Sequence, residues 1–222
     1  MSQNLSEQPR WKILVADGQE VFLRGTLSFL KTQYPQAEIC TARTGEAVLT
    51  EIQRFQPDLV VLDVILPEKI GEPARSEAGI QLLKILMQKY PNLHLTVQST
   101  CIKLLIRIRA EIDGHKGGFT AVDKSLSGQD LLTRINWALQ GLTHTKDLGT
   151  DLEMKPEWLE VLRLAFVEEL TNRAIAQRMQ VSARTVQIYW TKIQEALEVY
   201  QEKGKDLKIQ TENRARKIGL ID

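Results

Sequence analysis

Residues 58–63 read Asp58-Leu59-Val60-Val61-Leu62-Asp63, four consecutive apolar residues between two carboxylates. A short, continuously apolar run predicts a strand that is buried on both faces, as in a parallel sheet covered by helices. Similar runs alternate along the first half of the chain with stretches whose apolar residues recur at helical spacing. The expected strands are 13–16, 38–42, 58–63, 93–99 and 119–122, and the expected helices are 21–31, 45–55, 79–90, 104–112 and 127–139. This alternation predicts an α/β domain with a five-stranded parallel sheet and right-handed crossovers.

Chemically active side chains follow four of these strands. In open sheets of this type, sites form at the carboxyl ends of the strands, and that edge would collect Asp17, Asp63, Ser99 and Lys124. A carboxylate there can act as a nucleophile and become an acyl phosphate. Mg²⁺ held by carboxylates and carbonyls would neutralise the charge on the transferring group, and the ammonium and hydroxyl would bind its oxygens. The pattern therefore predicts a phosphoryl-acceptor site.

Segments around this edge resemble the receiver domains of two-component systems. The matching stretches are Ile13–Asp17, Leu62–Pro67 and Asp123–Ser125. The resemblance covers residues 11–141 and implies a flavodoxin-like or CheY-like receiver fold. It further implies that Asp63 is the phosphorylated residue, and that Ser99 and Lys124 are the switch residues that bind the phosphoryl group.

The same resemblance implies a bound Mg²⁺ ion, whose ligands would be Asp17, Asp63 and the backbone carbonyl of Ile65. Receivers usually carry two adjacent acids after the first strand, whereas Gly18 follows Asp17 here and Glu20 is the nearest other acid. A second departure is the loop 68–78, which is longer than usual and lies beside the proposed acceptor. Two interpretations remain: a receiver phosphorylated at Asp63, and a degenerate receiver that keeps its fold as a dimerisation or partner surface.

The second half of the chain has a different pattern. Residues 142–153 are polar and lack apolar periodicity, which predicts a linker. Beyond it, helical spacing predicts a small all-α domain over residues 154–222. Its expected helices are 155–166, 172–179 and 182–197, followed by a charged extension (200–208) and a last helix (210–219). A short helix, a tight turn and a second helix form a helix-turn-helix, whose second helix can enter the major groove of DNA.

Residues 156–164 and 170–187 resemble the LuxR-type DNA-binding domain, and the match continues to Leu197 without a gap. A receiver followed by this module is the architecture of the NarL/FixJ-type two-component response regulators. The resemblance implies three partners: double-stranded DNA, a histidine kinase or phosphotransfer protein, and a second copy of the chain in a homodimer. The residues expected at DNA are Thr171, Arg173, Ser182, Arg184, Thr185, Gln187, Ile188 and Lys192.

Basic charge is concentrated on this module. The whole chain has 29 Lys and Arg against 28 Asp and Glu, a net charge of +1, which excludes a polybasic protein that coats nucleic acid. Residues 171–194 nevertheless contain four basic residues and no acid: Arg173, Arg178, Arg184 and Lys192. If all four met phosphates, the logarithm of affinity would fall against the logarithm of salt concentration with a slope of about −3.6, at about −0.9 per contact.

The remaining composition predicts a soluble cytoplasmic protein, and the resemblance implies a regulator rather than an enzyme. Cys40 and Cys101 are too few for a disulfide scaffold and suit a reducing cytosol. No apolar run approaches the roughly 18 residues of a membrane span, and residues 1–10 lack the apolar stretch of a signal peptide. We therefore expect a DNA-binding transcriptional response regulator with its input at Asp63. The alternatives are a DNA-binding regulator whose receiver is not phosphorylated, and a signalling adaptor that binds no DNA.

Overall fold

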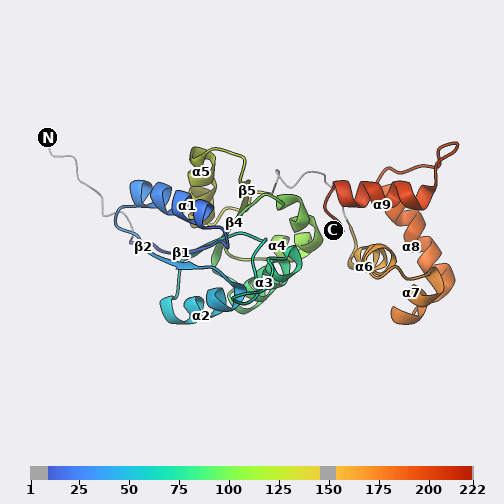
Figure 1. Cartoon of the computed structure of the whole chain (residues 1–222), viewed down its shortest axis with the longest axis horizontal. Coiled ribbons are helices and arrows are strands. Elements are labelled where there is room, and N and C mark those ends of the chain that lie inside the picture. The colour runs from blue at the N-terminus through green and yellow to red at the C-terminus, as the bar shows by residue number, and fades with distance from the viewer. Residues whose placement is uncertain (1–9, 146–153, 222) are drawn as a thin grey trace. The chain divides into compact units, whose positions relative to one another are not determined.

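The computed structural model describes residues 10–145 and 154–221 (Figure 1). These residues form two compact units, the first built from 10–102 and 108–145 and the second from 103–107 and 154–221. Within these ranges no helix is both long and apolar enough to cross a membrane.

The first unit contains a five-stranded sheet whose strands are all parallel, in the order β2-β1-β3-β4-β5. The strands are β1 Lys12–Ala16, β2 Glu38–Ala42, β3 Leu59–Leu62, β4 His94–Ser99 and β5 Phe119–Asp123. All residues of β3 are buried, as its continuous apolar run predicts. The predicted five-stranded parallel sheet is confirmed, and its strand order is that of the flavodoxin-like folds.

Helices cover both faces of the sheet, with α1 and α5 on one face and α2 and α3 on the other (Figure 1). Their bounds are α1 Glu20–Gln33, α2 Gly45–Phe55, α3 Ser76–Lys89 and α5 Gly128–Leu139. The start of α5 is fixed by a capping box, in which Ser127 and Asp130 each accept a hydrogen bond from the other's backbone N–H. This box holds the loop that follows β5 in place.

The segment between β4 and β5 differs from the prediction of one α-helix over 104–112. The chain forms a 3₁₀-helix, η1 Ile102–Ile108, followed by the short helix α4 Arg109–Asp113. All five apolar residues of η1 are buried, namely Ile102, Leu104, Leu105, Ile106 and Ile108. Burial therefore does not follow one face of a helix, and the apolar pattern could not distinguish a 3₁₀-helix from an α-helix.

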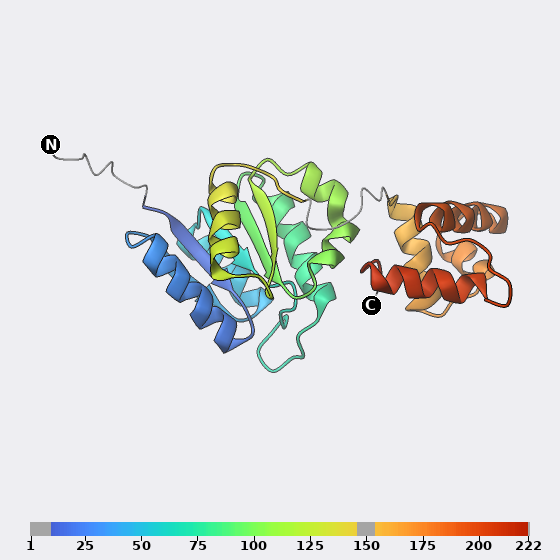
Figure 2. The ribbon, with the colours of Figure 1, turned by 90° about the horizontal axis from the view of Figure 1, so that it is seen from above.

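The loop before α3 protrudes from the unit but is anchored at both ends (Figure 2). At its start, the N–H groups of the first two residues of α2 donate to the carbonyls of Pro67 (2.9 Å) and Glu68 (3.1 Å). At its end, Leu66 and Arg75 form an antiparallel bridge. Residues 76–78, which the sequence assigns to the loop, instead form the first turn of α3. The long loop therefore starts and ends beside Asp63.

The chain that leaves α5 returns to the sheet. The N–H of Phe119 donates to the carbonyl of Leu142 (3.1 Å), and the N–H of His144 donates to the carbonyl of Phe119 (2.8 Å). These bonds hold the chain along β5 as far as His144. Of the predicted linker 142–153, residues 146–153 lie outside the described residues.

The second unit is helical, with α6 Pro156–Phe166, α7 Asn172–Arg178, α8 Ala183–Ala196 and α9 Leu207–Lys217. Its core is formed by buried side chains from all four helices, among them Val161, Ile175, Val186, Ile193 and Ala215. The last helix begins earlier than the predicted residue 210, because the carboxylate of Asp206 caps it by accepting two backbone N–H bonds. The predicted small all-α domain is confirmed.

We expect Gly79→Ala to lower the free energy of unfolding by about 3 kcal/mol, because a side chain there is overpacked against rigid backbone. A Cβ at position 79 would lie 2.0 Å from the carbonyl oxygen of Val64, the residue after Asp63. Gly25→Ala in α1 is the matched control, since its Cβ would meet nothing within 4 Å, and we expect it to gain about 0.5 kcal/mol. Urea unfolding measures both variants, and equal stabilities would contradict the close packing of α3 on Val64.

Candidate functional site

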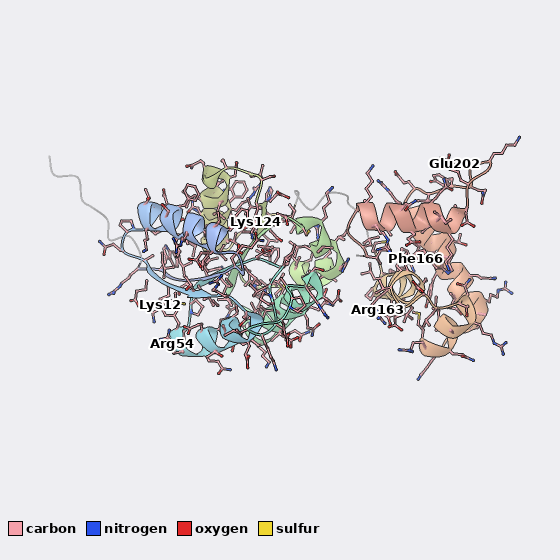
Figure 3. All side chains as sticks on the ribbon, viewed as in Figure 1. Lys12, Arg54, Lys124, Arg163, Phe166 and Glu202 are labelled. Atoms are coloured by element: carbon pink, nitrogen blue, oxygen red, sulfur yellow. The ribbon has the colours of Figure 1, made fainter. Side chains whose placement is uncertain are left out.

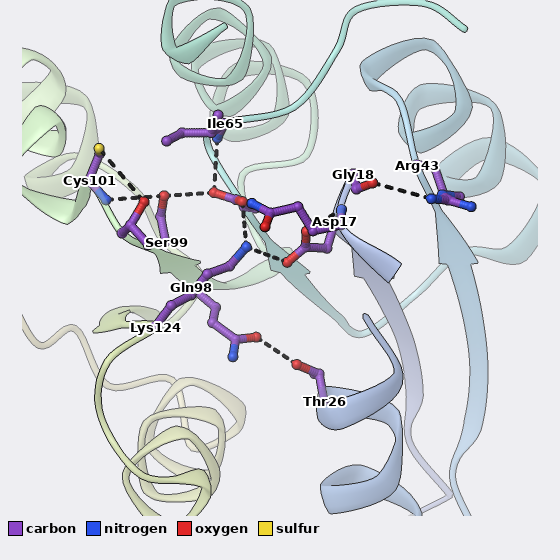
Figure 4. Close-up of polar contacts among 12 residues, drawn as sticks. Asp17, Gly18, Thr26, Arg43, Ile65, Gln98, Ser99, Cys101 and Lys124 are labelled. Carbon is purple, nitrogen blue, oxygen red and sulfur yellow. Dashed lines mark hydrogen bonds and ion pairs between the residues drawn. The ribbon is translucent and has the colours of Figure 1, made fainter. Parts of the chain in front are cut away.

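The carboxyl ends of four strands bring the predicted acceptor residues together (Figure 4). Asp17 follows β1, Asp63 follows β3, Ser99 ends β4 and Lys124 follows β5. All four residues are buried, with at most 9% of their surface exposed. Two carboxylates, a hydroxyl and an ammonium thus share one edge of the sheet, where the strand-end rule places them.

The ammonium of Lys124 bridges the two carboxylates. Its Nζ lies 2.6 Å from Oδ2 of Asp17 and 2.6 Å from Oδ2 of Asp63. The ring of Phe22, on α1, covers the ammonium in a cation–π contact, with 4.2 Å between Nζ and the ring centroid. Lys124 is therefore enclosed within the α/β unit (Figure 3), where charge-assisted hydrogen bonds are strong because water is excluded.

Each carboxylate oxygen of the site has a hydrogen-bond donor. Oδ1 of Asp63 accepts from the hydroxyl of Ser99 (2.6 Å) and from the backbone N–H of Ile65 (2.9 Å). Oδ1 of Asp17 accepts from the backbone N–H of Gln19 (2.8 Å). Two carboxylates and one ammonium leave a formal charge of −1 in a buried site. Burial raises the pKa of Asp17 above its ordinary value, although the hydrogen bond from Lys124 opposes the rise.

The oxygen donors of this site do not fit the Mg²⁺ ion that the family resemblance implies. The position beside Asp17 is Gly18, which supplies no ligand. Glu20 does not replace the missing acid, because its exposed carboxylate pairs with Arg24 (2.6 Å) and Arg43 (3.2 Å). In the ranges that the structure describes, no three His, Cys, Asp or Glu side chains form a group that could hold a metal. Asp17 and Asp63 are the remaining carboxylates, and Lys124 binds both.

Three contacts of the site were missed in the sequence. The sequence pattern gives Phe22 only as one of the apolar residues at helical spacing in the first helix. That spacing cannot show that its ring contacts the ammonium of Lys124, which follows β5. The N–H of Gln19 and the guanidinium of Arg43 were not considered, although Arg43 donates to the carbonyl of Gly18 (3.3 Å). The proximity of Gln19 to Asp17 in sequence was an available signal, because a carboxylate commonly accepts from the N–H two residues on.

The helix-turn-helix of the second unit consists of α7 and α8. The hydroxyls of Thr171 and Ser182 cap these helices, each accepting a hydrogen bond from the N–H three residues on (3.4 and 3.0 Å). The indole N–H of Trp190 on α8 donates to Oδ1 of Asn172 at the start of α7 (2.9 Å). The two caps fix the starts of α7 and α8, and the indole bond fixes the first turn of α7 against α8.

The side chains expected at DNA gather at the start of α7 and on one face of α8. Thr185 differs from the rest, because it is half-buried and its hydroxyl lies 2.8 Å from that of Ser182 within the cap. Ile188 is an apolar residue with 52% of its surface exposed. Thr191 lies exposed on the same face and was missed, although its spacing from Gln187 is helical. The remaining predicted residues are all exposed: Thr171, Arg173, Ser182, Arg184, Gln187 and Lys192.

Two of the four basic residues of this module are paired with acids. Arg178 lies 3.6 Å from the carboxylate of Glu168, and Lys192 lies 2.8 Å from that of Glu195. Within the part of the chain that the structure describes, Arg173 and Arg184 have no ion pair, and both are exposed. The strongest unneutralised positive charge of α7 and α8 therefore lies near their N-termini, where the helix dipoles also favour an anion.

Glu168 also joins the helix-turn-helix to the preceding helix. It accepts a hydrogen bond from Arg163 of α6 (2.5 Å), and Arg163 in turn pairs with Glu160 (2.7 Å). The hydrogen bond with Glu160 is the main cause of the raised pKa of the Arg163 guanidinium. This network orders the turn before α7.

Comparisons with known proteins agree with this fold. No family model matches the chain. It is 25% identical to the transcriptional activator protein ExaE of Pseudomonas putida over 84% of this chain and 90% of ExaE. It is 33% identical to the transcriptional regulatory protein YhcZ of Bacillus subtilis over 39% of this chain, a match that spans only 36% of YhcZ.

Among solved structures, two of the RcsB protein are similar over nearly the whole chain. One is the two-component response regulator RcsB in complex with DNA, with a TM-score of 0.60 at 19% identity over 94% of this chain and 98% of RcsB. The other is RcsB from Salmonella enterica serovar Typhimurium bound to a promoter with the phosphomimetic BeF₃⁻, with a TM-score of 0.59 at 20% identity over 92% of this chain and 97% of RcsB. These similarities establish the fold.

We expect Lys124→Met to lower the free energy of unfolding by about 3–5 kcal/mol at neutral pH, because it leaves two buried carboxylates without their counterion. Lys31→Met, at an exposed position on α1, is the control and should change stability by less than about 0.5 kcal/mol. The pKa of Asp17 is already raised, and removing the ammonium raises it further, so the folded state binds a proton more tightly than the unfolded state. The deficit should therefore shrink as the pH falls towards 4. Urea unfolding between about pH 4 and pH 7 measures this loss of stability. A loss that does not change with pH would contradict the ion pairs of Lys124 with Asp17 and Asp63.

Proposed function

We propose that this chain, which has the two-domain fold of the NarL/FixJ-type response regulators, is a cytoplasmic DNA-binding transcriptional regulator. Residues 11–141 act as the receiver, 142–153 as the linker and 154–222 as the LuxR-type DNA-binding domain. The input is phosphorylation of Asp63 by a histidine kinase or a phosphotransfer protein. The observation that carries the proposal is the convergence of Asp17, Asp63, Ser99 and Lys124 at one strand edge.

The phosphoryl transfer uses groups that already contact Asp63. An Oδ of Asp63 attacks the phosphorus of the donor, the new P–O bond forms, and the donor's own bond to phosphorus breaks as the dephosphorylated donor leaves. The phosphoryl group carries about −1.5 to −2 charges, and because it replaces the single negative charge of the carboxylate, the net addition to a site held by one ammonium is about −0.5 to −1. Lys124 and Ser99, at 2.6 Å from the Asp63 carboxylate, bind the new oxygens and leave their present acceptors. The Mg²⁺ ion that the resemblance implies would be held by Asp17, Asp63 and the Ile65 carbonyl, but these residues do not fit it, and the step as written does not use it.

DNA binding is assigned to the exposed face of α8. Its first two turns carry the exposed side chains of Gln187 and Ile188, which offer an amide and an apolar surface. Such groups read adenine and the thymine methyl in the major groove. Phosphates would be contacted by Thr171, Arg173, Ser182, Arg184 and Lys192, and such contacts position the protein without reading sequence. ExaE and YhcZ are transcriptional regulators by name, and the RcsB structures contain DNA, which supports the assignment.

A homodimer completes the proposal. One of the similar structures contains two RcsB dimers bound to two DNAs, which supports dimerisation here. A dimer would bind half-sites separated by about 34–36 Å, one turn of the DNA helix.

A second candidate is a DNA-binding regulator whose receiver is not phosphorylated. It is favoured by the state of Asp63, which is 2% exposed and already has a donor at each carboxylate oxygen. In this case a protein or small-molecule signal replaces the phosphoryl group. The helix-turn-helix has the same role in both candidates.

We expect salt-dependent binding to promoter fragments with a slope of about −1.8 per protomer, because two unpaired arginines each contribute about −0.9. Arg184→Ala should weaken binding and reduce the size of the slope by about 0.9. Arg178→Ala, which removes a guanidinium already paired with Glu168, is the matched control and should change the slope less. Fluorescence anisotropy over a salt series measures both. If the wild type binds no fragment, the protein is an adaptor and the DNA-binding assignment is wrong.

We expect acetyl phosphate to produce an acid-stable, base-labile acyl phosphate on the wild type and none on Asp63→Asn, because the amide is not a nucleophile for this step. Glu72→Gln, in the exposed loop before α3, removes a nearby carboxylate and should leave labelling unchanged. Intact-mass spectrometry detects the modification. An unlabelled wild type would decide in favour of the second candidate.

A further inference from the structure

The ammonium of Lys124 lies at the carboxyl edge of the sheet (the acceptor edge, formed by Asp17, Asp63, Ser99 and Lys124), where receiver domains bind a metal ion. The Nζ of Lys124 lies at 2.6 Å from one oxygen of each carboxylate, so it occupies the space between Asp17 and Asp63. The lysine side chain is 1% exposed, and the ring of Phe22 covers it. We propose that Lys124 has taken over the role of the divalent cation in this chain, and that its acceptor site does not bind Mg²⁺.

The number of oxygen ligands supports this assignment. Mg²⁺ demands a nearly octahedral set of oxygens and gives up its bound water reluctantly. The side chains at this edge offer two carboxylates, and their four oxygens already accept hydrogen bonds from Lys124, Ser99 and two backbone N–H groups. A metal ion would have to displace these donors and then lie beside an ammonium that has no other acceptor in the site.

Position 18 is where the third carboxylate is absent. A Cβ built on Gly18 would lie 3.2 Å from Cδ of Pro67 and 3.9 Å from Cδ1 of Leu66, so a side chain there requires Pro67 to shift by a few tenths of an ångström. The carbonyl of Gly18 accepts from Arg43 (3.3 Å), and Arg43 also pairs with Glu20 (3.2 Å). The charges that flank Gly18 are thus the Asp17 carboxylate and the Arg43 guanidinium, and Glu20 is held away from the acceptor.

The inference deepens the proposed function and rests on it in one respect, namely that Asp63 is the acceptor. Lys124 alone would then neutralise the negative charge of the phosphoryl group on Asp63. The site would assemble without Mg²⁺. Metal binding itself can be measured on the unmodified full-length protein without DNA or a phosphoryl donor. A failure of this inference is therefore distinguishable from a failure of the proposed function.

The test compares the full-length wild type with Gly18→Asp and Gly18→Asn. The aspartate restores the family's second acid, and the asparagine has nearly the same shape without the charge, so both meet Pro67 equally. Mg²⁺ binding is measured by isothermal titration calorimetry, and Mn²⁺ binding by the loss of the free-ion electron paramagnetic resonance signal. Circular dichroism and the melting temperature establish that each variant is folded, and Gly18→Ala reports the steric cost alone.

We expect Gly18→Asp to bind both metal ions saturably, and the wild type and Gly18→Asn to show at least tenfold weaker binding or none. Introducing Asp63→Asn into Gly18→Asp should abolish the gained binding, which locates it at the acceptor edge. Wild-type binding as tight as that of Gly18→Asp, and lost in Asp63→Asn, would overturn the proposal. Absence of binding in all variants would overturn the role given to Gly18. The inference would then rest on Lys124, and metal binding by Lys124→Gln with Gly18→Asp would confirm that role.

Discussion

The buried ion pair of Lys124 with Asp17 and Asp63 is the interaction on which the first unit's site depends. It joins the loops that follow β1, β3 and β5, which are not adjacent in the chain, at a single atom. Because the three charged groups are almost fully buried, each needs the others to offset the loss of water. This contact therefore holds together the residues that follow β1, β3 and β5, including the proposed acceptor Asp63.

Much of this arrangement could be predicted from the sequence, because parallel strands place their carboxyl ends together whatever the details of packing. Asp17, Asp63, Ser99 and Lys124 were found in this way. The contacts between them could not be predicted, since a strand position gives no side-chain direction. The 3₁₀-helix over Ile102–Ile108 was missed for a related reason, because five apolar residues among seven fit several helical periods equally well.

The helix-turn-helix shows a different limit of sequence patterns. Most residues of its exposed face were named from the sequence, although Thr185 is half-buried and Thr191 was missed. Its charge was overestimated, because residues 171–194 contain no acid whereas Glu168 and Glu195 flank that window and fold back on Arg178 and Lys192. A count of charges over 171–194 leaves out both acids, although one helix turn brings Glu195 next to Lys192 and the fold of the chain before α7 brings Glu168 next to Arg178.

The contact between Lys124 and Phe22 has a consequence for helix α1. Phe22 also lines a cavity of 220 Å³, together with Val21, Phe29, Leu126 and Leu131, and Thr26 one turn further on bonds to Gln98 of β4 (2.8 Å). The ring that contacts the ammonium thus also forms part of this cavity's wall, so the carboxyl edge of the sheet and the apolar surface between α1 and α5 share one side chain.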